Sequence, residues 1–153
     1  MTRALAIVVA LSLTNTLMSA QADARGAAAP VAAPQSILVH VTHGPEAPTR
    51  AALAFSVARA ALEEGHRVSV FLAGDAVQLM RDEVLNTLVG VGTGNLREWY
   101  DGIVAKGGRF YVSQGSSRAR GVTENDLKGK PVEFAGPPQL VRLTLAHDRT
   151  FTY

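Results

Sequence analysis

Short apolar runs that are bounded by glycine or polar residues recur along the chain after residue 35. Ser36–Thr42, Arg67–Ala73 and Arg109–Ser113 are rich in β-branched and aromatic residues, which favour strands. Two shorter runs of the same kind occupy Pro131–Ala135 and Arg149–Tyr153. The pattern therefore predicts about five β-strands.

Between these strands, apolar residues follow the spacing of three and four positions that is typical of helices. Helices are predicted at Thr49–Glu64, which is rich in alanine and ends at Gly65, at Asn95–Lys106, and at Pro138–His147, which begins with proline. The helix at Asn95–Lys106 has the clearest apolar stripe, and we expect this stripe to face the core: Leu96, Trp99, Tyr100, Ile103 and Val104.

The order of these elements indicates the fold class. Strands that alternate with helices are joined by crossover connections, so neighbouring strands run parallel and helices cover both faces of the sheet. The sequence thus predicts a three-layer α/β/α fold with a mainly parallel sheet of about five strands, in one domain at residues 36–153. Ligands of such folds bind where the strands end, at the carboxyl edge of the sheet.

The first 35 residues have a different composition. Residues 1–24 combine Arg3 with an apolar stretch that is too short to span a bilayer, followed by small residues, which is typical of a secretory signal peptide cleaved after Ala22 or Ala24. An uncleaved membrane anchor is the alternative. Residues 25–35 are mostly alanine, proline and glycine and are predicted to form a linker. We expect a periplasmic or secreted protein with no membrane association after cleavage.

Composition narrows the function classes. The chain has 47% hydrophobic and 18% charged residues, a net charge of +2 and no cysteine. This charge is too small and too scattered to indicate nucleic-acid binding. Thiol chemistry is excluded, and neither a cofactor nor a metal site is expected, because histidines and carboxylates are not clustered at ligand spacing. The glycines between residues 90 and 95 do not match a dinucleotide-binding motif and indicate a loop before a capped helix.

Polar residues follow several of the predicted strands. Ser113, His43 and Asp75 each lie near the end of a strand, as a nucleophile, a base and an orienting acid of a hydrolase would. The glycine pattern of a nucleophile elbow is incomplete here, and Asp75 is equally well explained as the N-cap of a helix at Ala76–Arg81.

The segment that follows Ser113 offers a second kind of site. Its sequence, SQGSSRARG, enters a helix from a glycine-containing loop, which directs backbone N–H groups at a ligand. Arg118 and Arg120 would add positive charge, so a small anionic ligand is one interpretation. A capped helix start with two solvated arginines is the other.

Five segments resemble the DsrE/DsrF-like family: Thr42-His43-Gly44-Pro45, Gly65-His66-Arg67-Val68, Val70-Phe71-Leu72-Ala73-Gly74, Lys106-Gly107-Gly108-Arg109-Phe110-Tyr111-Val112 and Arg118-Ala119-Arg120-Gly121. The resemblance covers residues 36–153. It implies a parallel-sheet α/β fold, assembly as a trimer or hexamer, and sulfur-relay chemistry on a cysteine at the end of a central strand. In this chain the family's cysteine positions correspond to Ser113 and, for members with C-x-x-C, to Ser116, and a serine hydroxyl cannot hold a persulfide.

The sequence therefore predicts an exported, cysteine-less member of this family that acts as an oligomeric binding or accessory protein related to sulfur metabolism. A hydrolase that uses Ser113 with His43 is one alternative, and a structural subunit of a hetero-oligomer whose partner carries the cysteine is another. The candidate binding residues are Thr42, His43, Gly44, Asp75, Ser113, Ser116, Ser117, Arg118 and Arg120.

Overall fold

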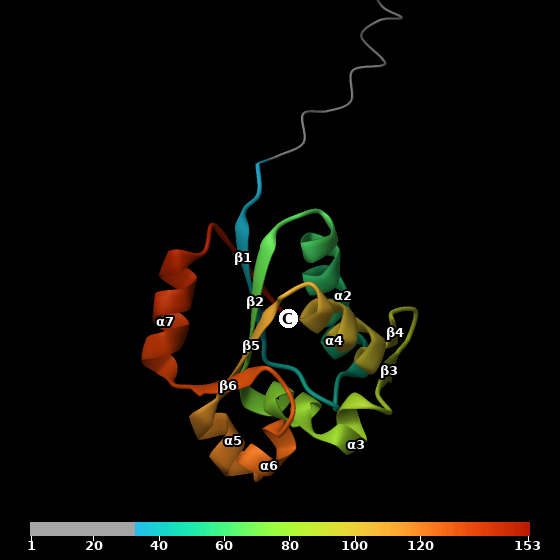
Figure 1. The fold of residues 1–153 in the computed structure, drawn as a ribbon. Helices are drawn as coiled ribbons and strands as arrows, with labels where there is room; N and C mark the ends of the chain where they lie inside the picture. The colour runs from blue at the N-terminus through green and yellow to red at the C-terminus, as the bar shows by residue number, and fades with distance from the viewer. Residues whose placement is uncertain (1–32) are drawn as a thin grey trace, which may run out of the picture. The chain divides into compact units, whose positions relative to one another are not determined.

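The structure is a computed structural model that describes residues 33–153 (Figure 1). The signal peptide expected at residues 1–24 and the linker residues 25–32 lie outside this range. Within residues 33–153, none of the helices has the length and apolarity needed to cross a membrane.

Five parallel strands form the central sheet, in the order β6-β5-β2-β1-β7. This confirms the predicted fold class, and each predicted strand is present within one residue at either end. The strands are β1 (Ser36–Val41), β2 (Arg67–Leu72), β5 (Arg109–Ser113), β6 (Val132–Ala135) and β7 (Arg149–Thr152).

Helices cover both faces of this sheet (Figure 1). One face carries α2 (Pro48–Glu63) and α4 (Leu96–Ala105), whereas α7 (Pro137–Ala146) lies on the other. The shorter helical segments are η1 (Gly74–Met80), α3 (Asp82–Leu85), α5 (Gln114–Arg120) and α6 (Glu124–Leu127). The segments η1 and α5 directly follow β2 and β5, so they stand at the carboxyl edge of the sheet.

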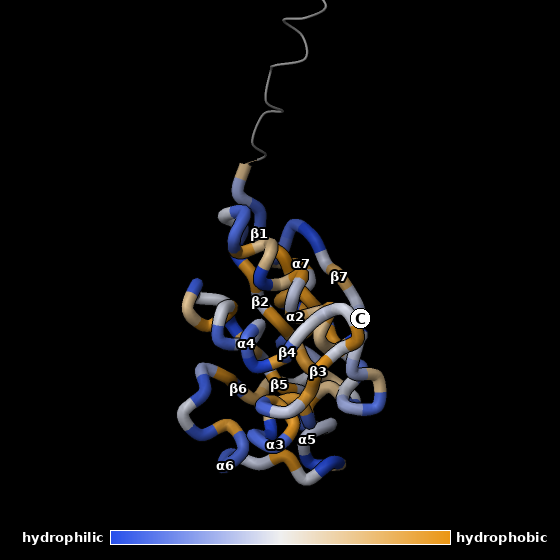
Figure 2. Tube along the Cα trace, turned by 90° about the vertical axis from the view of Figure 1, so that its right-hand side faces the viewer, coloured by the Kyte–Doolittle hydropathy of each residue, from blue (hydrophilic) through white to orange (hydrophobic). Residues whose placement is uncertain are grey.

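The main core fills the space between the sheet and α2 and α4. Alternate residues of β1, β2 and β5 point into it because successive side chains of a strand face opposite ways. Phe110 lies at its centre, with ring centroids 5.6 Å from Phe55 of α2 and 5.0 Å from Tyr100 of α4. Figure 2 shows the hydrophobic residues concentrated along β1 and β2.

The core on the opposite face is much smaller. Leu38, Phe71, Tyr111 and Ala135 of the sheet pack there with Leu143 of α7. The outer side of α7 leaves Val141 and Leu145 exposed.

One prediction about the residues before α4 was wrong. Residues 89–95 form a small antiparallel hairpin of β3 (Val89–Gly90) and β4 (Gly94–Asn95) instead of a loop. Asn95 does cap α4, and its side chain accepts a hydrogen bond from the backbone N–H of Arg97 at 2.8 Å. Trp99, however, is only partly buried, because it is turned toward this hairpin and donates from its Nε1 to the carbonyl oxygen of Thr93 at 2.6 Å.

Candidate functional site

The candidate residues gather at the carboxyl edge of the sheet because β1, β2 and β5 are parallel neighbours that end on the same side. Residues 42–44 follow β1, Asp75 follows β2, and the serines and arginines at 113–120 belong to β5 and α5. The edge is therefore built from three separate parts of the chain.

The two serines at the predicted cysteine positions both make structural hydrogen bonds. Ser113 ends β5 and is the N-cap of α5, and its Oγ accepts the backbone N–H of Ser116 at 3.4 Å. The Oγ of Ser116 in turn accepts the backbone N–H of Gly74 at 3.0 Å. These hydroxyls connect α5 to the turn that begins η1.

Asp75 forms the second connection between the same two segments. Its Oδ1 lies 2.7 Å from the Nε of Arg120 in an ion pair. The prediction that Asp75 caps a helix at Ala76–Arg81 was wrong: the helical segment is a 3-10 helix from Gly74 to Met80, its N-cap is Ala73, and no side chain caps it. The carboxylate of Asp75 forms an ion pair with the guanidinium group of Arg120 instead.

Gly44 brings the loop after β1 against the loop after β2. A Cβ atom at Gly44 would overlap the backbone carbonyl oxygen of Asp75. The backbone N–H of Gly44 also donates to both carboxylate oxygens of Glu46, at 2.9 and 3.0 Å. Glycine is required here by close approach of two backbones, since its φ is not in the left-handed region.

Thr42 and His43 face other partners. The Oγ1 of Thr42 donates to the carbonyl oxygen of Tyr153 at 2.9 Å, and the Nε2 of His43 lies 3.1 Å from the Nη1 of Arg50. Because an arginine can only donate, this contact makes Nε2 of His43 an acceptor.

Within residues 33–153 no hydrogen bond joins Ser113 to a histidine. The reason is topological: β2 lies between β1 and β5, so the strand ends that carry His43 and Ser113 are separated by two inter-strand spacings, about 10 Å. The geometry supplies Ser113 with no base.

The arginines of α5 do not converge at its N-terminal end. Both Arg118 and Arg120 lie in the last turn of this seven-residue helix, and the charge of Arg120 is paired with Asp75. Arg118 instead borders a small cavity of about 200 Å³ together with Gln114, Ser117 and Glu124. Ser117 is 1% exposed, and its hydroxyl has no hydrogen-bond partner among the described residues.

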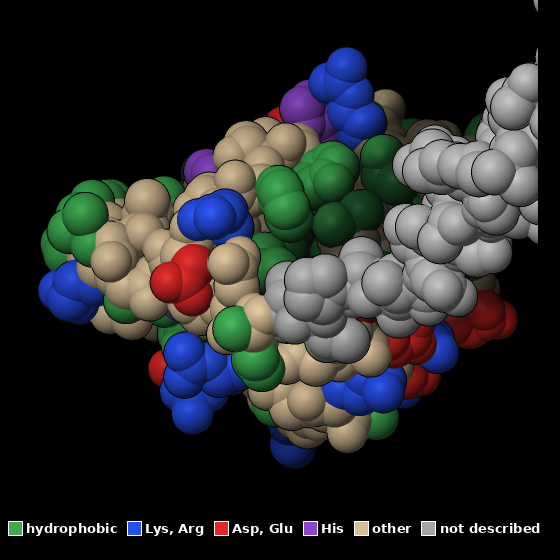
Figure 3. All heavy atoms as spheres, turned by 90° about the horizontal axis from the view of Figure 1, so that it is seen from above, with side chains coloured by type: hydrophobic (Ala, Val, Ile, Leu, Met, Phe, Trp, Pro, Cys, Tyr) green, Lys and Arg blue, Asp and Glu red, His purple; other side chains and the backbone are tan. Residues whose placement is uncertain are grey.

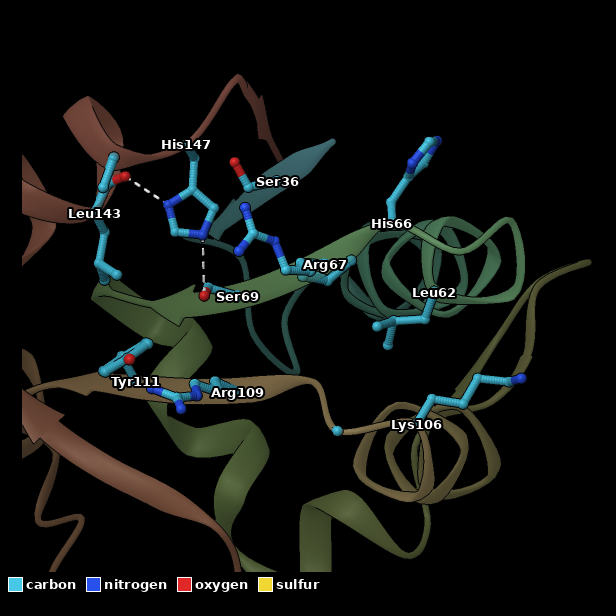
Figure 4. A pocket seen from close by; sticks show the side chains of 13 residues that line it. Ser36, Leu62, His66, Arg67, Ser69, Lys106, Arg109, Tyr111, Leu143 and His147 are labelled. Atoms are coloured by element: carbon cyan, nitrogen blue, oxygen red, sulfur yellow. Dashed lines mark hydrogen bonds between the residues drawn. The ribbon is translucent and has the colours of Figure 1, made fainter. Parts of the chain in front are cut away.

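Two polar features lie outside the predicted set. His40 of β1 has an Nε2 without a partner in the described part of the chain, stands edge-on to Phe71 at 5.9 Å, and has a pKa lowered by burial. A larger cavity, about 530 Å³, opens at the amino edge of the sheet between α7 and the first residues of β2 and β5 (Figure 4). The sequence did not predict this cavity, because ligands of parallel α/β folds usually bind at the carboxyl edge of the sheet.

No group of three or more histidine, aspartate or glutamate side chains in residues 33–153 is arranged to hold a metal ion.

Comparison with known proteins identified one family and several solved structures that share the fold of this chain. A family model described as the DsrE/DsrF-like family matches residues 35–153. No curated protein sequence matches. Among solved structures, the ychN protein from E. coli is 19% identical with a TM-score of 0.61, and the match covers 78% of this chain and 99% of that chain.

Two further structures have the same fold. A protein of unknown function, MTH1491 from Methanobacterium thermoautotrophicum, is 19% identical with a TM-score of 0.60, and the match covers 78% of this chain and 99% of that one. A conserved protein of unknown function, BT1422 from Bacteroides thetaiotaomicron, is 14% identical with a TM-score of 0.56, and the match covers 78% of this chain and 95% of that one. At these identities the likeness concerns the fold.

Proposed function

Because this chain belongs to the DsrE/DsrF-like family and contains no cysteine, we propose that it is an exported, oligomeric binding or accessory protein related to sulfur metabolism that carries no sulfur itself. The family match includes the whole carboxyl edge of the sheet, residues 42–44, 74–75 and 113–120. In this proposal the protein has the scaffold of a sulfur-relay protein but does not form a persulfide, because it has no cysteine.

The observation that carries this proposal is the role of Ser113. It stands at the end of β5, where the family resemblance implies a sulfur-carrying cysteine, and its hydroxyl accepts the N–H of Ser116 as a helix cap. A serine hydroxyl is far less acidic than a thiol, whose ordinary pKa is about 8.5, so it needs a base to become a nucleophile. In residues 33–153 the hydrogen bonds of Ser113 include no such base.

Binding at this edge has a physical candidate in the small cavity beside α5. Arg118 borders it, and its guanidinium group can donate hydrogen bonds to a small anion. Ser117 also lines this cavity, but its hydroxyl is buried. Glu124 also borders the cavity and opposes a strongly charged ligand. A weakly bound small anion is therefore the ligand class we assign to this edge.

The test converts Ser113 into the missing thiol. Ser113→Cys changes the side-chain size little, and the N–H of Ser116 that now reaches the hydroxyl would stabilise a thiolate. After incubation with a small persulfide donor, we expect intact-mass measurement to show a gain of one sulfur in this variant. The matched control is Ser56→Cys on α2, whose hydroxyl donates to the carbonyl of Leu53 and which lies outside the edge.

If the thiol pKa at this position is lowered by about one unit, the thiolate fraction near neutral pH rises roughly tenfold. Because a less basic thiolate is also a weaker nucleophile, Ser113→Cys is expected to react roughly threefold faster than Ser56→Cys. A folded Ser113→Cys protein that reacts no faster than the control would contradict the assignment of this position. Ester hydrolysis by the natural protein that disappears in Ser113→Ala would replace the binding function with a hydrolase.

A further inference from the structure

The cavity at the amino edge of the sheet is lined by basic, hydroxyl and apolar side chains and by no aspartate or glutamate. It measures about 530 Å³, within the range of small-molecule sites. Figure 3 looks onto this end of the molecule and shows Lys, Arg and His side chains beside hydrophobic ones.

Two arginines from neighbouring strands supply its charge. Arg67 begins β2 and Arg109 begins β5, and the strand register pairs Arg109 with Ser69, two residues after Arg67. The two arginines thus lie on the same face of the sheet, with Cα atoms about 8 Å apart. In Figure 4 the side chain of Arg67 points toward His147, and that of Arg109 lies along Tyr111, whereas His66 and Lys106 point away from them.

Neither guanidinium group forms a hydrogen bond or an ion pair within residues 33–153, although hydrogen bonds from Ser36 and the charges of Arg149 and Arg67 lower the pKa of the Asp148 carboxyl. Among the arginines of residues 33–153, the side chains of only three, Arg67, Arg109 and Arg118, have no hydrogen-bond or ion-pair partner. The neighbouring carboxylate of Asp148 is held by the backbone N–H and the hydroxyl of Ser36, at 2.8 and 2.7 Å. Two guanidinium groups without ion-pair partners on adjacent strands are both free to donate hydrogen bonds to an anionic ligand.

The remaining polar groups of the cavity are held in defined orientations. The Nδ1 of His147 lies 2.6 Å from the carbonyl oxygen of Leu143, which requires a proton on Nδ1. In the neutral ring, Nε2 then accepts the hydroxyl of Ser69 at 3.1 Å. Tyr111 adds a third polar side chain. The apolar wall of the cavity has two parts, Leu143 on the α7 side of the sheet and Leu62 with Val68 on the α2 side.

We propose that this cavity binds a small molecule through an oxyanion group held between Arg67 and Arg109, with the apolar wall receiving the rest of the ligand. Arginine side chains are long and flexible, so two arginines with Cα atoms about 8 Å apart can both bring their planar guanidinium groups to the oxygens of one sulfate, sulfonate or phosphate group. The site lies at the opposite edge of the sheet from Ser113. A test of this site therefore does not depend on the function proposed for the carboxyl edge.

The experiment measures binding of three probes, inorganic sulfate, inorganic phosphate and propanesulfonate, to the full exported chain by NMR titration or calorimetry. We expect saturable binding, with propanesulfonate tighter than the inorganic ions because its alkyl chain reaches the apolar wall. Arg67→Gln and Arg109→Gln are each expected to weaken binding at least tenfold, since each removes one charged pair of hydrogen bonds. Both side chains are exposed, so the variants are expected to fold normally.

Two other arginine variants locate the effect. Arg142→Gln, on the exposed part of α7, makes the same change in net charge and is expected to leave binding unchanged. If Arg118→Gln abolishes binding while Arg67→Gln and Arg109→Gln do not, the anion binds at the carboxyl edge and this proposal is overturned. It is also overturned if no probe binds saturably, or if Arg67→Gln changes only the oligomeric mass, which would make this face a subunit contact.

Discussion

At the scale of single residues, the carboxyl edge is held together by contacts that leave little room for substitution. Gly44 touches the backbone of Asp75, Ser116 accepts the N–H of Gly74, and Asp75 pairs with Arg120. Each contact joins two segments that are distant in sequence. Sequence reasoning placed these residues at one edge, yet it could not show that they bind one another, since that depends on which strands are neighbours.

We expect Gly44→Ala to destabilise the domain by about 1–3 kcal/mol, because a methyl group there overlaps the carbonyl oxygen of Asp75 and forces the two loops apart. Urea denaturation of the variant measures this loss. Gly115→Ala is the matched control, since a Cβ at Gly115 meets nothing within 4 Å and the position is helical. Equal stability of the Gly44 and Gly115 variants would show that the loop after β1 moves freely.

At the scale of elements, the predictions that depend on periodicity were the most accurate. The strands β1, β2 and β5 and the helices α2, α4 and α7 were all expected, because each has a continuous apolar pattern and a glycine, a proline or a polar cap at an end. The two-residue strands of the β3–β4 hairpin have no such pattern. The cavity between Arg67 and Arg109 was missed for a related reason: strand register, which no single segment contains, brings them together.

Helix α4 shows how periodicity can be correct while one side chain is misplaced. Tyr100 is 4% exposed and packs on Phe110, and burial raises the pKa of Tyr100 to about 12. Trp99, on the rim of the same helix, lies between the β3–β4 hairpin and Arg59, whose guanidinium carbon is 5.5 Å from the ring centroid. Trp99 thus packs against the edge of the main core, whereas its neighbour Tyr100 is buried within it.

We expect Tyr100→Ala to cost about 3–5 kcal/mol of unfolding free energy, as for other buried aromatic residues, and Trp99→Ala to cost about 1–3 kcal/mol because its ring is only partly buried. Tyr100→Phe tests the packing interpretation, since the hydroxyl of Tyr100 is buried without a partner in the described part of the chain. Its removal is expected to leave stability equal or slightly higher. Denaturant titrations of the three variants under the same conditions rank their unfolding free energies. A larger loss of stability for Trp99→Ala than for Tyr100→Ala would show that Trp99, and not Tyr100, is the main core residue of α4.

At the scale of the whole molecule, the family and the fold are established by residues 35–153, whereas export and assembly are proposals that concern the first residues and the surface. The exposed Val141 and Leu145 on α7, with Phe151 of β7 and Val91 of the hairpin, offer apolar surface for subunit contacts. Which of these surfaces meets another subunit depends on symmetry, and one chain's sequence carries no direct signal for symmetry.

We expect the mature protein to begin between Asp23 and Gly26 and to be a trimer or hexamer. Small residues at Ala20, Ala22 and Ala24 follow an apolar stretch too short to span a bilayer, which predicts cleavage at that place. N-terminal sequencing of exported protein and native mass spectrometry check the two parts. Recovery of intact Met1 in a membrane fraction would contradict export, a monomer would contradict assembly, and a second subunit mass would indicate the hetero-oligomer.

The position of β7 beside β1 affects the order in which the sheet is completed. These two strands are the last and the first in chain order, yet they are hydrogen-bonded neighbours, and Ser36 also binds Asp148 across the same long separation. During synthesis, one side of β1 therefore has no strand partner until residues 149–152 have been made. Pairing between such distant segments slows folding, because a large loop must close before the contact forms. One edge of the growing sheet therefore stays without its partner strand until β7 is available, although β1, β2, β5 and β6 can already pair.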